Sequence, residues 1–222
     1  MQHATQIRGF SLFVIAAVLF VQGCASSGPK PYKPLNSVMT IVVDDRVTLP
    51  PKVFYLSAGQ AWGQGVGGLI GGSIAAANGP DEDLGRYLQG KGIAMDQILV
   101  QEAKDIINKS GRLQIVDDPK QADVVLRFSI TKYGFIAKNV LSGKLKTILR
   151  VETKVSDRNG KTIFSDEDNN DSERVQYSLK EFLAEPERIR AGFHEVANQA
   201  ADDQISGLLD EIGDFRLPPA AN

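Results

Sequence analysis

The protein has 222 residues, with 25 Lys and Arg against 27 Asp and Glu, so its formal net charge is −2 at pH 7. No basic excess is present to neutralise a phosphate backbone, which argues against nucleic acid as the main partner. With Cys24 as its single cysteine the chain cannot form an internal disulfide, so the hydrophobic core must stabilise the fold without one. A chain of this length can bury one good core, and we expect one domain.

The N-terminal segment has the pattern of an export signal. Arg8 precedes an apolar run over residues 10–21, which is shorter than the ~20 residues needed to cross a bilayer. The run ends in Val21-Gln22-Gly23-Cys24, which resembles the cleavage motif of bacterial lipoproteins. The resemblance implies a signal peptide over 1–23 and fatty acyl chains such as palmitate on Cys24. Because Ala25 rather than an acid follows, it also implies an outer-membrane anchor, with the domain facing the periplasm.

The rest of the chain divides by composition. Residues 24–37 are rich in Ser, Gly and Pro and are interpreted as a tether that lifts the domain off the bilayer. A single domain is predicted over 38–213, with a glycine-rich insertion at 59–79 and a loose tail at 214–222.

The first half of the domain predicts two short strands, a helix and a third strand. β-Branched residues favour a strand over 38–47, and a second follows at 52–56. Helix signals begin at Asp81, are interrupted by Gly90 and Gly92, and end at Gly111. One face of this helix is apolar: Met95, Ile98, Leu99, Ala103, Ile106 and Ile107. A short strand is predicted at 113–116.

The second half predicts three strands and a long helix. Apolar and polar residues alternate over 124–131 and 149–155, and Asn159-Gly160 favours a hairpin turn into 161–164. Apolar residues then recur at helical spacing from Pro186 to Gly213. We therefore expect an α+β fold, in which an antiparallel sheet carries two amphipathic helices on one face as a two-layer sandwich.

This order of elements, together with the hairpin from Arg150 to Phe164, resembles the domains of envelope lipoproteins. The similar families are the auxiliary lipoproteins of lipid-transport ABC systems and, more distantly, the lipopolysaccharide-assembly lipoprotein. The resemblance implies an accessory role in an envelope transport or assembly complex.

The glycine-rich insertion has three interpretations. Gly63, Gly65 and Gly68 satisfy the G-x-G-x-x-G pattern of a nucleotide loop, but Gly71 and Gly72 weaken the helix that such a loop requires. The four-residue spacings from Gly67 and from Gly68 instead favour a smooth helix face for close packing against a partner or lipid. A glycine-rich loop with Trp62 against the sheet explains the same residues equally well.

The residues considered as contacts to a partner or a membrane all come from this insertion. They are Trp62, Gly63, Gly67, Gly68, Gly71 and Gly72.

Two other features of the sequence bear on metal binding and catalysis. Asp166 to Glu173 partly matches a calcium loop but lacks its glycine and its final Glu, so a solvated turn is favoured. His194 lies beside the apolar stripe of the last helix with no Ser or Cys nucleophile indicated near it. We expect neither a metal site, nor a cofactor, nor an enzyme.

The leading hypothesis is a non-catalytic, lipid-anchored envelope lipoprotein that binds an envelope protein, either a partner or further copies of itself. The alternative is a module that binds lipid or another envelope ligand under a glycine-rich lid. A hydrolase acting through His194 ranks last.

Overall fold

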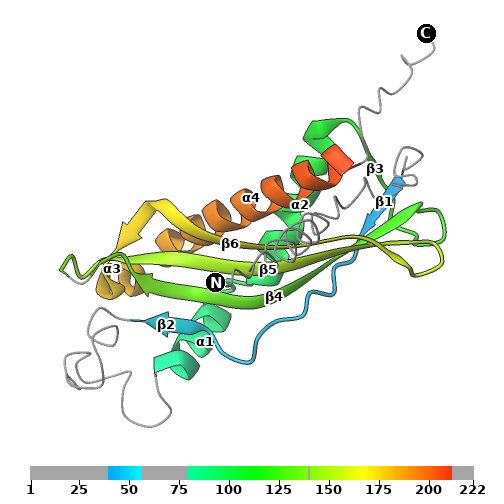
Figure 1. The fold of residues 1–222 in the computed structure, drawn as a ribbon. Coiled ribbons are helices and arrows are strands. Elements are labelled where there is room, and N and C mark those ends of the chain that lie inside the picture. The colour runs from blue at the N-terminus through cyan, green and yellow to red at the C-terminus, as the bar shows by residue number, and fades with distance from the viewer. Residues whose placement is uncertain (1–39, 57–79, 140, 212–222) are drawn as a thin grey trace, which may run out of the picture. The chain divides into compact units, whose positions relative to one another are not determined.

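Three long antiparallel strands form most of the sheet in the computed structural model, which describes residues 40–56, 80–139 and 141–211 (Figure 1). The strands are β1 (Thr40–Val43), β2 (Phe54–Leu56), β3 (Gln114–Ile115), β4 (Val124–Ala137), β5 (Leu145–Asp157) and β6 (Thr162–Tyr177). The helices are α1 (Pro80–Gly90), α2 (Met95–Ser110), α3 (Leu179–Ala184) and α4 (Pro186–Glu211).

The sheet is mixed rather than antiparallel. Its strand order is β3-β1-β4-β5-β6, and β2 pairs with β4 beside this path. β4, β5 and β6 are antiparallel as predicted, whereas β1 runs parallel to β3 and β4, and β2 runs parallel to β4. The prediction of a wholly antiparallel sheet is therefore wrong, because the chain returns to this sheet through helices, and such crossovers give parallel neighbours.

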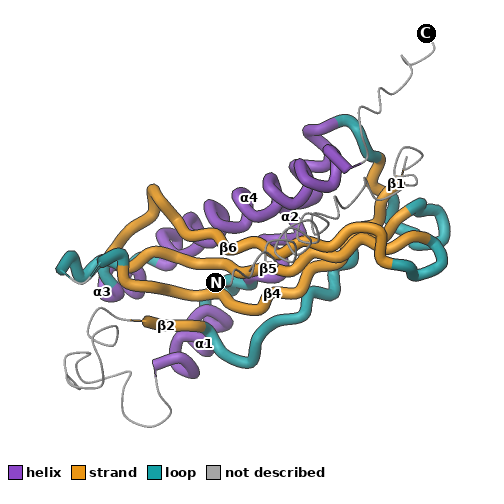
Figure 2. Tube along the Cα trace, in the orientation of Figure 1, coloured by secondary structure: helices purple, strands orange, loops and turns teal. Residues whose placement is uncertain are grey.

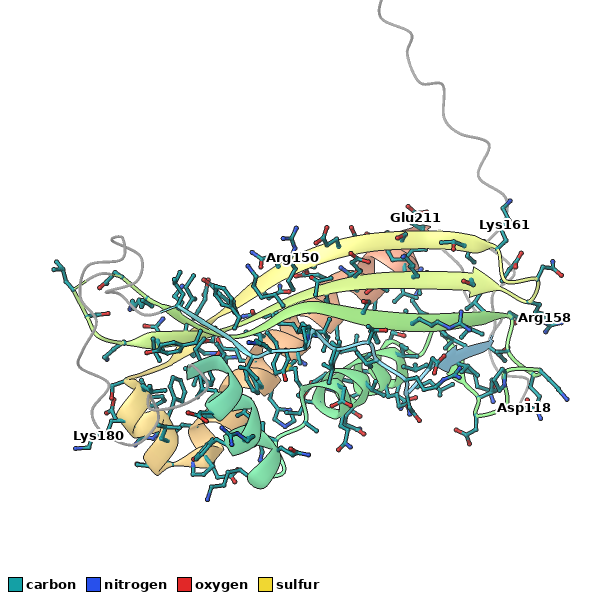
Figure 3. All side chains as sticks on the ribbon, turned by 90° about the horizontal axis from the view of Figure 1, so that it is seen from below. Asp118, Arg150, Arg158, Lys161, Lys180 and Glu211 are labelled. Atoms are coloured by element: carbon teal, nitrogen blue, oxygen red, sulfur yellow. The ribbon has the colours of Figure 1, made fainter. Side chains whose placement is uncertain are left out.

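The helices pack against one face of the sheet (Figure 3). α4 contacts β5 and β6, and α2 contacts α4 and β1. The α+β class is confirmed, and both predicted helices are present. The predicted two-layer sandwich with only two helices is not confirmed. The sheet curls, α1 precedes α2 as a separate helix, and α3 precedes α4.

The local signals explain most element ends. α2 ends at Gly111, which takes the left-handed conformation with φ 62° and donates its N–H to Asn108. α3 begins with a capping box between Ser178 and Glu181. The predicted hairpin turn at Asn159-Gly160 joins β5 and β6, with Gly160 at φ 78°.

β6 is much longer than its sequence suggests. It includes the whole acidic run from Asp166 to Glu173, which was expected to be a turn. Asp166 lies opposite Thr153, and Asp168 lies opposite Val151. Backbone pairing with β5 thus overrides the poor strand propensity of Asp and Asn.

The core lies between the sheet and the helix layer. Alternate residues of β4 and β5 are buried there as predicted, and α4 adds its apolar stripe. Aromatic rings fill the end near β2: the centroid of Phe135 lies 5.3 Å from that of Phe182 and 5.7 Å from that of Phe193. These ring contacts pack α3 and α4 against the part of β4 that pairs with β2.

Candidate interaction end of the sheet

The glycine-rich insertion joins the domain at one end of the sheet. Trp62, Gly63, Gly67, Gly68, Gly71 and Gly72 lie outside the described residues, as does Cys24. The described chain stops at Leu56, the last residue of β2, and resumes at Pro80, the first residue of α1. Figure 1 shows both attachment points at the same end of the molecule. We call this region, formed by β2, α1, α3 and the β4–β5 turn, the β2 end.

β2 is held against β4 by a close backbone approach. Phe54, Tyr55 and Leu56 lie opposite Gly134, Phe135 and Ile136. Gly134 has φ 143°, and a β-carbon on it would lie 2.8 Å from the backbone nitrogen of Phe54. Only glycine fits there, because any side chain would collide with β2. The ammonium of Lys132 covers the Phe54 ring at 4.5 Å from its centroid.

α1 joins the two sides of the β2 end. A β-carbon built on Gly85 would lie 3.7 Å from Val53 Cγ2, so the helix packs closely on the segment that leads into β2. On its other side, the Tyr87 hydroxyl donates a 2.7 Å hydrogen bond to the Leu183 carbonyl of α3. Both attachment points of the insertion are therefore tied to packed elements.

The β4–β5 turn projects from the same end (Figure 2). The Lys138 N–H donates to the Lys144 carbonyl at 2.9 Å and closes the turn. Asn139 Oδ1 accepts hydrogen bonds from the N–H groups of Leu141 and Ser142, at 3.1 and 2.7 Å. Leu141 is 96% exposed. This turn is not among the predicted elements, although Asn139 and Ser142-Gly143 on either side of an apolar pair are a turn signal in the sequence.

The carboxylate of Glu195 binds backbone N–H groups of the edge strand β6. Four residues of β6, 172–175, lie opposite the single residue Thr147 of β5, so β6 forms a bulge there. Glu195 of α4, which is 8% exposed, accepts hydrogen bonds from the N–H groups of Glu173, Arg174 and Val175 at 3.0, 3.0 and 3.1 Å. Burial raises the pKa of Glu195, but the three N–H donors together outweigh it, and the net pKa lies below its ordinary value.

His194 forms part of a contact between two helices. Its Nδ1 lies 2.7 Å from Glu102 Oε1, and Asn198 donates to Glu102 Oε2 at 2.8 Å. These contacts fasten α4 to α2. No Ser or Cys hydrogen bond to the imidazole is present among the described residues, so this contact forms no nucleophile–base pair there.

The described ranges contain neither a candidate metal cluster nor a candidate membrane-spanning helix. Residues 40–56, 80–139 and 141–211 contain no group of three or more His, Cys, Asp or Glu side chains that could hold a metal ion. In the same ranges, no helix combines the length and apolar character needed to cross a bilayer.

No protein family and no curated protein matches this sequence. Similar solved structures include a Xanthomonas campestris protein of family model DUF330, with 11% identity, 82% of this chain and 90% of that chain covered, and a TM-score of 0.48. A PelC dodecamer from Paraburkholderia phytofirmans has 10% identity, covers 82% of this chain and 95% of that chain, and has a TM-score of 0.38.

Rare lipoprotein B from Shewanella oneidensis is also similar, with 18% identity, 50% of this chain and 85% of that chain covered, and a TM-score of 0.37. A lipoprotein is thus among the similar solved structures. At these TM-scores no function is carried over to this chain.

Proposed function

We propose that this protein is a non-catalytic lipoprotein of the bacterial envelope, anchored in the outer membrane by acyl chains on Cys24 and facing the periplasm, where it binds an envelope protein as an accessory subunit. The proposed location of the protein rests on the lipoprotein motif at Val21 to Cys24. The proposed activity rests on one observation: both attachment points of the glycine-rich insertion are built into the packed β2 end.

The β2 end suits a binding role because it presents the insertion from a rigid base. Leu56 is paired with Ile136, and α1 is fastened to α3 through Tyr87. A partner that contacts the insertion therefore meets a surface whose base loses little conformational freedom on binding. Small residues spaced four apart, such as Gly67 and Gly71, permit close backbone approach in such a contact.

The test compares the full-length protein with a variant that lacks residues 63–77. Both are crosslinked in intact cells, extracted in mild detergent and sized, and their crosslinked partners are identified by mass spectrometry. A defined complex that the deletion abolishes is the expected result. The paired substitution Gly67→Leu with Gly71→Leu keeps the length of the insertion and should weaken the same complex.

Equal behaviour of the wild type and the deletion variant, both as solitary monomers, would refute partner binding. Lipid that co-purifies with an acyl-free Cys24→Ala protein, in the absence of any protein partner, would instead support the ligand-binding alternative. Metabolic labelling with a fatty acid tests the anchor separately, since Cys24→Ala should abolish incorporation.

A further inference from the structure

The β4–β5 turn holds an apolar side chain away from the protein. Leu141 is 96% exposed, whereas Leu49, the other large apolar side chain that is exposed in the described part, is 39% exposed. Two hydrogen bonds to Asn139 Oδ1 and the left-handed Gly143, at φ 61°, fix the path of the turn. The exposure of Leu141 is therefore a consequence of a defined turn.

Two lysines flank this leucine in the turn. Lys138 and Lys144 form the two sides of the turn, both are exposed, and neither makes an ion pair with a described acid. Lys180 of α3 is exposed at the same end of the molecule (Figure 3). Glu181 of α3 interacts electrostatically with Lys144, but it also accepts hydrogen bonds from Ser178 and lies 3.8 Å from Arg188. The turn thus combines one apolar tip with a cationic base.

We propose that the β4–β5 turn is a second membrane contact, in which Leu141 inserts among the headgroups of a bilayer containing anionic phospholipid while Lys138 and Lys144 bind the lipid phosphates. An interfacial contact of this kind combines buried apolar area with electrostatic attraction to anionic lipid. The contact requires neither the acyl anchor nor the protein partner, so it goes beyond the proposed function.

A bilayer fits this turn better than a protein surface does. A stable protein interface buries roughly 800 Å² on each partner, and a narrow turn that exposes Leu141 is too small to form the apolar core of such an area. A bilayer accepts an isolated apolar side chain at any point, and lysine side chains extend readily to its phosphates.

The experiment measures co-sedimentation of the acyl-free protein, from residue 24 onward with Cys24→Ala, with large vesicles. One set contains phosphatidylcholine alone, and the other contains equal parts of phosphatidylcholine and phosphatidylglycerol. We expect binding to the anionic set that falls as salt is raised. Leu141→Ser should weaken it about tenfold. Each of Lys138→Glu and Lys144→Glu should weaken it at least fivefold, the factor that corresponds to about 1 kcal/mol per lysine near an anionic surface.

Lys161→Glu is the matched control, because Lys161 is exposed at the opposite end of the sheet (Figure 3). It makes the same charge change and should leave binding unchanged. The proposal is overturned if the wild type does not sediment with anionic vesicles, or if Leu141→Ser and Lys138→Glu bind as the wild type does. A photoreactive residue at position 141 that crosslinks in cells to a protein rather than to lipid would also overturn it.

These outcomes are distinct from those of the proposed function. Deletion of residues 63–77 tests the protein complex and leaves the β4–β5 turn intact. Leu141→Ser tests the lipid contact and leaves the insertion intact. Because Leu141 is 96% exposed, its substitution removes almost no buried contact and should leave the fold unchanged.

Discussion

Gly134 lies against the backbone of Phe54 so closely that a β-carbon on it would lie 2.8 Å from the Phe54 nitrogen and nearer still to its carbonyl oxygen. This approach allows β2 to join β4, and β2 in turn holds one attachment point of the glycine-rich insertion. The position of β2 therefore depends on the absence of a side chain at residue 134.

Gly134→Ala should detach β2 from β4. The new methyl group collides with backbone, and φ 143° is unfavourable for alanine. We expect a loss of about 2 kcal/mol in the free energy of unfolding, measured by urea denaturation, and faster hydrogen exchange at Tyr55. Gly90→Ala is the control, since nothing lies within 4 Å of its added β-carbon. An unchanged stability in Gly134→Ala would contradict the close approach.

Glu195→Gln should destabilise the bulge of β6. The amide presents one neutral acceptor where the carboxylate accepted three backbone N–H groups, so a loss of about 2–3 kcal/mol is expected at pH 7. The lowered pKa of Glu195 means that its stabilisation is complete above the unfolded-state pKa of 4.5 and is lost as the pH falls through the lower folded-state pKa. Chemical denaturation of both proteins at several pH values measures this difference.

The difference in unfolding free energy between the wild type and Glu195→Gln should therefore shrink as the pH falls below the unfolded-state pKa of 4.5. Glu173→Gln serves as the control, because that side chain is exposed and should change stability little. A difference that stays constant down to pH values well below 4.5 would argue against a lowered pKa.

Asp44→Asn tests an ion-pair cluster beside β1. The pKa of Asp44 is lowered to about 2, chiefly by the hydrogen bond from the Arg46 side chain and further by Arg127. The shift from 3.8 to about 2 corresponds to at most about 2.5 kcal/mol, and since Arg46 is largely solvated we expect about 1 kcal/mol. NMR titration of the carboxyl carbon checks the pKa directly.

This stabilisation is present above pH 3.8 and disappears as the pH falls toward 2. Asp45 is the comparison residue, since it pairs with Lys104 at 2.8 Å but its side chain is 73% exposed. Asp45→Asn should lower the free energy of unfolding less than Asp44→Asn does. A midpoint for Asp44 near the ordinary value of an aspartate would contradict the cluster.

Glu102→Gln tests whether the His194 contact is structural. Glu102 binds both His194 and Asn198 on α4, and the amide can satisfy only one of these donors. We expect a loss of about 1 kcal/mol in unfolding free energy. Asp105→Asn, which changes an exposed hydrogen bond to Gln101 within α2, is the control. A hydrolytic activity in envelope extracts that disappears with His194→Ala, while stability is retained, would contradict a purely structural role.

Periodicity determined the elements whose signal lies in neighbouring residues. Alternation identified β4 and β5, the 3.6-residue stripe identified α2 and α4, and Asn159-Gly160 identified the hairpin, because each pattern reflects the local geometry of one element. The α+β class followed from these elements. The lipoprotein motif at Cys24 and the glycine-rich contact residues 62–72 also came from sequence, and both stay predictions because they lie outside the described residues.

Contacts between distant segments decided the rest. The acidic run 166–173 became a strand because β5 supplies its backbone partners, and β1, β2 and β3 became parallel because helices return the chain to the sheet. No sequence pattern singled out Ser178 or Glu195. Ser178 caps α3, and Glu195 binds three N–H groups that lie 20 or more residues away in the chain. Leu141 became a candidate contact in the same way: strand pairing placed its turn at the end where β2 and α1 meet, and no local pattern encodes that pairing.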